Sequence, residues 1–265
     1  MSYAVKQIRT LMGKAIHTYG MIQDGEHIMV AVSGGKDSLT LLWELRKRLK
    51  RVPIEYHLTA VHVNPGFNSE SAFRMEAFFK THGFPYKVIR SDVGLKAHSQ
   101  ENRENPCFLC ARLRRKLLFE TAAELGCNKI AFAHHKDDII ETFFINLFYG
   151  ASISTMLPVQ TFFRGNIVII RPFFMVDEFL IERYVREMHW SPIDLGCPTA
   201  SAIGKNGKGH KRQEIRHMLR DLYRSNKKVK GNIFHAIHNV RQDYLPKAPS
   251  KAKRHPISMT MESAH

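Results

Sequence analysis

Short apolar runs alternate with amphipathic stretches through the first two-thirds of the chain. The runs are rich in β-forming residues and end at Gly, Pro or polar residues, as buried parallel strands do. We expect strands at 27–33, 57–64, 86–91, 128–135 and 166–173. Apolar residues at helical spacing predict helices at 3–20, 38–50, 69–82, 107–126, 136–150, 176–189, 211–225 and 229–240. This order predicts an α/β fold: a parallel, doubly wound sheet of about five strands, with extra helices at both ends.

The same pattern divides the chain into four parts. We expect an N-terminal helix in 1–24, an α/β domain in 25–190, a segment of basic helices with a cysteine loop in 191–245, and a basic tail of disordered composition in 246–265. In a doubly wound sheet the ligand crevice lies at the carboxyl ends of the strands. The polar residues that follow those ends are therefore the first candidates for a site.

Charge points to a polyanionic partner. The formal net charge is +16 and the pI is about 9.8. Residues 205–265 hold 15 Lys and Arg against 4 Asp and Glu, so this quarter of the chain carries +11 of the total. Nucleic acid is the first expectation and an anionic membrane surface the second. The N-terminus has no continuous apolar region, and no run approaches the length of a membrane span, so we expect a soluble, cytoplasmic protein.

A compact polar motif follows the first predicted strand and precedes a helix. It consists of Ser33, Gly34, Gly35, Lys36, Asp37 and Ser38. The glycines let the backbone turn tightly, and exposed N–H groups at the helix start form an anion site with the two hydroxyls and the Lys cation. A carboxylate is out of place in a phosphate pocket unless Mg²⁺ bridges it to the phosphates. A simple glycine turn with a capping residue would not account for all six residues.

A second polar motif follows the fourth predicted strand: His134, His135, Asp137, Asp138 and Glu141. Asp138 and Glu141 share one helix face because they are three residues apart. Both strands end at the same sheet edge, so this motif can face the first. We assign Asp138 a metal or nucleotide role and His134 or His135 a substrate-facing role. Helix capping by the aspartates is a compatible alternative.

The first motif resembles that of the PP-loop ATP pyrophosphatases, and the second resembles the H-H-x-D-D-x-x-E-T element of their tRNA-modifying branch. The resemblance implies cleavage of ATP between the α and β phosphates and transfer of AMP to a substrate oxygen. It assigns Asp37, Asp138 and His135 to catalysis. The implied ATP site comprises Ser33, Gly34, Gly35, Lys36, Asp37, Ser38, Val61, His62, His134 and Asp138.

Cysteines suggest a metal centre. Cys107 and Cys110 open a helix and are followed by several Arg residues, which favour the thiolate form. Cys197 lies in a later loop, and Cys127 reads as a plain buried residue. Three thiolates without an obvious fourth ligand suit Zn²⁺ or an iron–sulfur cluster.

Longer segments, among them ENPCFLCARLRRKLL and VIIRPF, resemble the TtcA family of tRNA 2-thiocytidine synthetases. The resemblance runs from about residue 5 to 245. It implies a 4Fe-4S cluster on Cys107, Cys110 and Cys197, with the fourth iron free to hold sulfur. It also implies a homodimer, with a cysteine desulfurase or another persulfide donor as a partner.

Basic residues near both the cysteines and the C-terminal helices are candidates for tRNA phosphate contacts. They are Arg112, Arg114, Arg115, Lys211, Arg212, Arg216 and Arg220. Asp221 is nearly the only acid close to the last group in sequence. This scarcity favours phosphate contact over a merely solvated helix face.

The sequence thus predicts an ATP-dependent tRNA thiolase. It would adenylate a pyrimidine carbonyl, C2 of a cytidine in the anticodon loop, and replace the oxygen by sulfur held at the cluster. One alternative is a PP-loop ligase or amidase that acts on a small carbonyl compound and carries structural zinc. Another is a non-catalytic RNA-binding protein, which leaves the phosphate motif unexplained.

Overall fold

The computed structural model describes residues 2–199 and 211–246. In this part of the chain six strands form one sheet in the order β3-β2-β1-β4-β6-β5. The strands are β1 (Glu26–Ala31), β2 (Tyr56–Asn64), β3 (Tyr86–Arg90), β4 (Lys129–Ala131), β5 (Val159–Phe162) and β6 (Ile167–Ile170). The strand order reverses direction between β1 and β4, which is where a doubly wound sheet opens its ligand crevice.

The sheet has one strand more than the sequence pattern predicts. The expected strand at 166–173 forms as β6, and β5 pairs antiparallel with it at the edge. β5 is four residues long and only partly buried, so it lacks the apolar run that marks the central strands. The tight turn between them holds Phe163 and Arg164 at positive φ, which the sequence does not signal.

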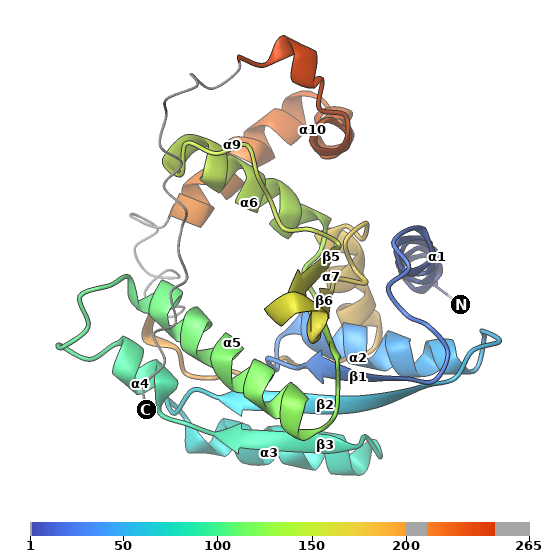
Figure 1. Ribbon diagram of the computed structural model, residues 1–265, viewed down its shortest axis with the longest axis vertical. Coiled ribbons are helices and arrows are strands. Elements are labelled where there is room, and N and C mark those ends of the chain that lie inside the picture. The colour runs from blue at the N-terminus through green and yellow to red at the C-terminus, as the bar shows by residue number, and fades with distance from the viewer. Residues whose placement is uncertain (1, 200–210, 247–265) are drawn as a thin grey trace.

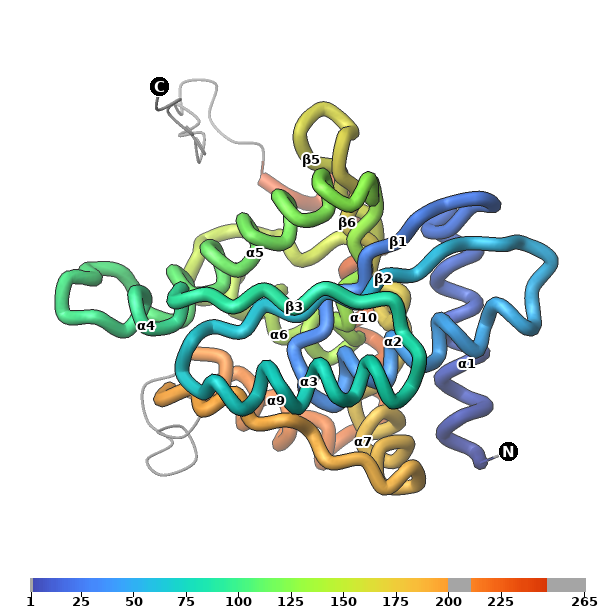
Figure 2. The backbone as a smooth tube through the Cα atoms, turned by 90° about the horizontal axis from the view of Figure 1, so that it is seen from below, coloured from blue at the N-terminus to red at the C-terminus, as the bar shows by residue number. Residues whose placement is uncertain are grey.

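Helices cover both faces of the sheet. The larger core forms where α1 (Tyr3–Thr18), α2 (Lys36–Leu49), α3 (Ser69–Thr81) and α7 (Glu178–Glu187) pack on one face. On the other face α5 (Pro106–Glu124) packs against β1, β2 and β4. Figure 2 shows β3 running between α5 and α3. The doubly wound architecture expected from the sequence is therefore confirmed.

The last helices form a separate packing unit. A third apolar cluster joins α6 (Lys136–Tyr149), α9 (Lys211–Ser225) and α10 (Val229–His238). Figure 1 shows α9 and α10 beside α6 at one end of the molecule. Because α6 begins soon after β4, this unit meets the sheet at the edge where the parallel strands have their carboxyl ends.

The predicted helices form with their ends shifted by a few residues at most. No element was predicted between residues 92 and 106, and this stretch contains the short helix α4 (Val93–Ala97). The tail at 247–265 and the Gly/Lys-rich stretch at 200–210 lie outside the described residues. Within 2–199 and 211–246, no helix combines the length and apolar character needed to cross a membrane.

Candidate active site

The phosphate motif forms a tight loop between β1 and α2. Gly34 adopts φ +86°, and a Cβ there would lie 3.3 Å from the backbone oxygen of Ile193. The Ser38 hydroxyl accepts a hydrogen bond from the Ser33 amide at 3.1 Å and donates to the Gly35 carbonyl at 3.0 Å. Gly35 is the N-cap of α2 and supplies no side-chain cap, so the first amides of that helix stay available to a ligand. The loop is therefore built as an anion site.

Lys36 and Asp37 connect this loop to α7. The Lys36 ammonium lies 2.8 Å from Glu178 Oε1 and 3.1 Å from Asp37 Oδ1. Burial raises the pKa of Asp37, although the charge of Lys36 opposes the shift. A carboxylate that is desolvated in this way is stabilised by any further cation that binds beside it.

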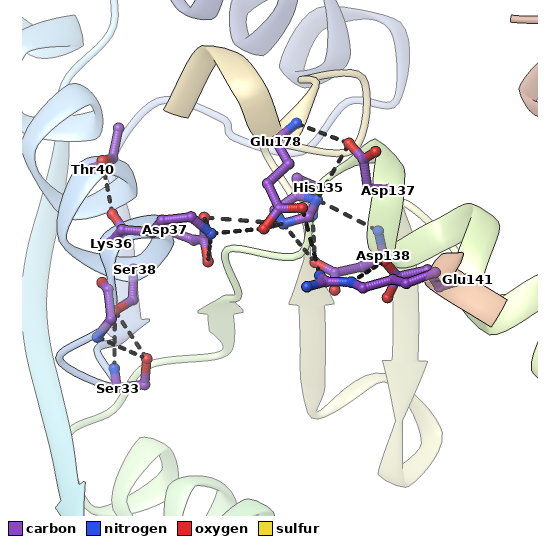
Figure 3. A network of polar contacts seen from close by, with 12 residues as sticks. Ser33, Lys36, Asp37, Ser38, Thr40, His135, Asp137, Asp138, Glu141 and Glu178 are labelled. Atoms are coloured by element: carbon purple, nitrogen blue, oxygen red, sulfur yellow. Dashed lines mark hydrogen bonds and ion pairs between the residues drawn. The ribbon is translucent and has the colours of Figure 1, made fainter. Parts of the chain in front are cut away.

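His135 and Asp138 form a reciprocal cap at the start of α6. The Asp138 amide donates to His135 Nδ1 at 3.4 Å, and the His135 amide donates to Asp138 Oδ2 at 3.1 Å. The other His135 ring nitrogen lies 3.4 Å from Asp138 and 3.9 Å from both Asp37 and Glu178. His135 therefore sits between the phosphate loop, α6 and α7 (Figure 3). His135 and Asp138 thus cap α6, and they also lie beside the phosphate loop.

A cavity of about 350 Å³ opens where the two motifs meet. Its walls include Ser33, Asp37, Ser38, Val61, Arg114, Arg115, His134, Asp138 and Arg171. The sequence analysis named all of these except Arg171. The cavity therefore brings the phosphate loop and the second motif together, as the edge-of-sheet argument predicted. Helix α5 adds a further wall, through Arg114 and Arg115, that this argument did not predict.

His62 is placed differently from its neighbour Val61. It is fully buried, and its Nδ1 donates to the Val32 carbonyl at 2.8 Å. Burial lowers its pKa, and its Nε2 has no hydrogen-bond partner among the described residues. Successive strand residues point to opposite faces, so Val61 reaches the cavity while His62 lies beneath the phosphate loop. Its predicted contact with ATP stays a prediction.

The cysteines converge near the start of α5. Asn105 caps this helix by accepting from the Cys107 amide at 3.0 Å. Burial raises the pKa of the Cys110 thiol; the Arg114 charge opposes this, and the nearby thiols of Cys197 and Cys107 add to it. Cys127 is 2% exposed in the core under α5, as expected. In the described part of the chain, no three His, Cys, Asp or Glu side chains are grouped so as to hold a metal ion.

The loop that carries Cys197 is attached to the phosphate loop. The Ile193 amide donates to the Gly34 carbonyl at 3.0 Å. Farther along, Thr199 contacts His98 Nε2 at 2.9 Å, next to α4. A segment remote in sequence is thus attached both to the phosphate loop and to the end of α4, which packs against the helix that bears Cys107 and Cys110.

Two of the predicted tRNA-binding arginines on α9 face carboxylates. Arg212 lies 3.0 Å from Asp138, and Arg216 lies 2.5 Å from Glu141 and 3.5 Å from Glu178. The carboxylates that pair with these two arginines come from α6 and α7. Arg220, on the next turn, is exposed. Tertiary structure thus separates residues that look equivalent along the helix, and their role toward RNA stays a prediction.

Three site residues have no clear signal in the sequence. Glu178 looks like an ordinary first-turn acid, and Lys230 looks like part of the basic face. In the structure Lys230 pairs with Asp137 at 2.6 Å and with Asp177 at 2.7 Å. Arg171 directly follows the apolar residues 168–170. This position at the end of a strand is the one feature of the sequence that could have identified it.

Comparison with known sequences agrees with this geometry. A family model described as a PP-loop domain matches residues 4–192. A tRNA-cytidine(32) 2-sulfurtransferase of Alkalilimnicola ehrlichii is 39% identical over 249 residues, covering 91% of this chain and 75% of the relative. Another, of Syntrophotalea carbinolica, is 35% identical and covers 93% of both chains.

Among solved structures, the fold is similar to that of the U34-tRNA thiolase NcsA from Methanococcus maripaludis, which was determined with its [4Fe-4S] cluster. The TM-score is 0.71 and the sequence identity is 20%, with 92% of this chain and 80% of that chain covered. At this identity the likeness supports the α/β fold with its helical extensions.

Proposed function

Because the chain belongs to the PP-loop domain family, and within it to the tRNA-cytidine(32) 2-sulfurtransferases, we propose that it catalyses ATP-dependent thiolation of C2 of a cytidine in a tRNA anticodon loop. The relatives are matched over nearly the full length of this chain, including the cysteine loop and the basic helices. Both the nucleotide chemistry and the sulfur chemistry are therefore assigned to this one polypeptide.

A single observation carries the proposal: helix α5 serves both chemistries. Its first turn carries Cys107 and Cys110, and its next turns place Arg114 and Arg115 in the wall of the cavity beside the phosphate loop. The Cys197 loop reaches the same place through the Ile193–Gly34 hydrogen bond. Ala111, the residue after Cys110, also lines this cavity, which supports placing a nucleotide on the loop near the cysteines.

The first half of the reaction is transfer of AMP. The C2 carbonyl oxygen attacks the α-phosphorus, a new O–P bond forms, and the bond to the β-phosphate oxygen breaks so that pyrophosphate leaves. The amides and hydroxyls of Ser33 and Ser38 hold the departing phosphates, and Lys36 offsets their charge. Asp37 fits Mg²⁺, since it is a desolvated carboxylate at the edge of this anion site. When bound, Mg²⁺ would neutralise phosphate charge.

The second half is sulfur insertion. A hydrosulfide attacks C2, the C–S bond forms, and the C–O bond breaks. AMP leaves with the oxygen, and the S–H proton is released. A thiol reductant would free this hydrosulfide from the persulfide of a cysteine desulfurase, which we propose as the partner.

Cys107, Cys110 and Cys197 fit an iron–sulfur cluster with one open iron. Cys107 and Cys110 lie at the N-terminus of α5, and Cys197 is close enough to influence Cys110, whose pKa is raised mainly by burial. The Arg114 charge opposes that shift, and a bound metal would stabilise the thiolate. Cysteine thiolates are the ligands that hold iron–sulfur clusters in proteins. When bound, the cluster would supply an iron that holds the sulfide.

The proposal is tested by anaerobic purification followed by iron, sulfide and zinc analysis, together with thiolation of tRNA in vitro. We expect about four irons and four sulfides per chain, lost together with thiolation in Cys107→Ala, Cys110→Ala and Cys197→Ala. Cys127→Ala is the matched control, because that thiol lies in the core, and it should keep both. Full thiolation by the triple site variant would refute the proposal.

Zinc in place of iron would instead favour the ligase or amidase alternative, which the sequence relatives do not support. Assembly as a homodimer, also proposed from the family, is tested by sedimentation of the holoenzyme.

A further inference from the structure

Arg171 is a buried cation that directly follows β6 and belongs to the cavity wall. It is 5% exposed. Its Nε donates to His134 Nδ1 at 3.3 Å, and its two terminal nitrogens donate to the Leu157 carbonyl at 2.5 Å and to Gln160 Oε1 at 3.4 Å. Three acceptors on three different residues therefore hold the buried guanidinium in one orientation.

The direction of the Arg171–His134 hydrogen bond fixes the state of the His134 ring. A guanidinium carries donors and no acceptor, so Nδ1 of His134 must be the acceptor. In the neutral imidazole the ring proton then resides on Nε2. In the described residues Nε2 has no protein partner, and His134 contributes to the cavity wall. The structure therefore places one neutral N–H group on a residue of the cavity wall, available to a ligand.

The ring is also held against rotation. Phe132, two residues earlier, stacks on His134 with an interplanar angle of 19° and a centroid distance of 5.5 Å. Burial lowers the pKa of His134 to about 4, with the Arg171 charge acting in the same direction. The imidazole consequently stays neutral at ordinary pH, as a donor that adds no net charge.

We propose that Arg171 is a positioning residue that holds His134 as the Nε2–H tautomer, so that this N–H donates to an oxygen of the α-phosphate during AMP transfer. The assignment rests on the proposed function for the identity of the reaction. Ser33, Ser38 and His134 border the same cavity, so a phosphate chain on the loop can extend toward the imidazole.

The chemistry explains why a donor is needed there. The carboxylates of Asp37 and Asp138 border the same cavity and can only accept hydrogen bonds while they are ionised. The α-phosphate oxygens gain or redistribute charge as the substrate oxygen bonds and pyrophosphate leaves. A preorganised neutral N–H stabilises that charge without repelling the cations of the site.

The tautomer is measured directly by long-range ¹H–¹⁵N correlation on protein labelled at histidine, with His134→Gln used for assignment. We expect His134 to show a protonated Nε2 and an unprotonated Nδ1, and its Nε2 signals to shift on adding Mg²⁺ with α,β-methylene-ATP. Gln160→Ala removes one weak acceptor of Arg171 and should leave the tautomer intact, whereas Arg171→Met should produce a mixture. A protonated Nδ1 in the unmodified protein would overturn the proposal, whether or not any variant folds.

Kinetics separate a donor from a structural ring. Glutamine can place its amide nitrogen where Nε2 lies, while asparagine places its amide near Nδ1. AMP formation with tRNA should fall about 100-fold in kcat for His134→Asn, with KM for ATP within a few-fold, because one oxyanion donor has this typical effect. His134→Gln should recover most of the rate. Equal losses in the two variants would contradict a donor at Nε2.

Failure of this inference is distinguishable from failure of the proposed function. If the tautomer and the nucleotide-induced shift are as expected but no tRNA is thiolated, the thiolase assignment falls and the positioning of His134 by Arg171 stands. If tRNA is thiolated at the full rate by Arg171→Met, the positioning role falls and the thiolase assignment stands.

Discussion

Two ionic clusters attach terminal helices to the body of this protein, and they differ in what lies beside them. In the first, termed the Glu44 cluster, Arg9 of α1 lies 2.7 Å from Glu44 of α2, which also accepts from the Tyr184 hydroxyl of α7 at 2.9 Å. The Glu44 side chain is fully buried in the larger core, away from the residues that border the cavity.

The second cluster, termed the α9 cluster, consists of Arg212 and Arg216 on α9 with Asp138, Glu141 and Glu178 on α6 and α7. Its arginine side chains are about 40% exposed, and Asp138 borders the cavity. The same pairing chemistry thus joins helices through a buried contact in the first cluster, and in the second it holds the carboxylates of α6 and α7 in a partly solvated setting. We expect stability to depend mainly on the first cluster and activity mainly on the second.

The largest effect on stability should come from Glu44→Ala. Removing the carboxylate leaves Arg9 and the Tyr184 hydroxyl without their main buried acceptor, and loss of one partner of a buried pair costs about 3–5 kcal/mol. Urea unfolding measures the change. Glu120→Ala is the control, since its ion pair with Lys116 is exposed and 3.8 Å long, and it should shift stability by less than about 0.5 kcal/mol. A similar loss of unfolding free energy in both variants would show that the buried pair contributes no more to stability than the exposed pair.

Arg216→Met should affect activity more than stability. The change leaves Glu141 buried with only Arg212, 3.6 Å away, as its counter-charge. Burial already raises the pKa of Glu141, with Arg216 opposing this shift, so the variant should raise it further and cost about 1–2 kcal/mol near neutral pH.

The way in which the stability deficit of Arg216→Met depends on pH follows from the protonation of Glu141. Because the folded-state pKa of Glu141 lies above its unfolded value of 4.5, its contribution favours folding at low pH and is lost as pH rises through the folded pKa. The Arg216→Met deficit should therefore be largest at high pH and shrink toward pH 4. AMP formation should fall at least tenfold. An activity equal to that of the unmodified enzyme would show that the pairing of α9 with the carboxylates of α6 and α7 does not support the reaction.

Asp177→Asn tests an ionic contact whose contribution to stability depends on pH in the opposite direction. Burial would raise the pKa of Asp177, but Lys230 at 2.7 Å and Lys136 at 2.9 Å outweigh it, so the pKa is lowered. The native carboxylate then contributes stability above the unfolded pKa, and that contribution is lost as pH falls through the folded pKa. We expect a deficit of about 1–2 kcal/mol that is constant above pH 5 and shrinks below pH 4. Thermal unfolding across pH 3–8 measures it, and a deficit that grows on acidification would be contrary to this assignment.

The smallest effect on folding should come from Arg220→Ala, one turn beyond Arg216. Arg220 is exposed, so the free energy of unfolding should change by less than about 0.5 kcal/mol. If tRNA phosphates lie along this face of α9, affinity should weaken uniformly across tRNA sequences, and the slope of log affinity against log salt should decrease by about one. Filter binding at several salt concentrations gives both values. An unchanged slope would remove Arg220 from the RNA contact.

Sequence alone determined the parts of this protein whose signals are local. Strand runs, helix periods and the Ser33–Ser38 motif each depend on neighbouring residues, and parallel strands must end at one edge. The meeting of the phosphate loop with His134 and Asp138 therefore followed without coordinates. The edge strand β5 was missed because a short, half-buried strand has no apolar run.

Only the tertiary structure decided which charges meet. Nothing local distinguishes Arg216 from Arg220, or indicates that Glu178 lies beside Lys36 and Arg216. Arg216 pairs with carboxylates 75 and 38 residues away, and His134 lies 37 residues before Arg171. These contacts depend on how α7 and α9 pack against α6 and on where β6 joins the sheet. Charge pairing and tautomer choice are set by three-dimensional proximity and burial, and these arise only when the helices and strands have been assembled.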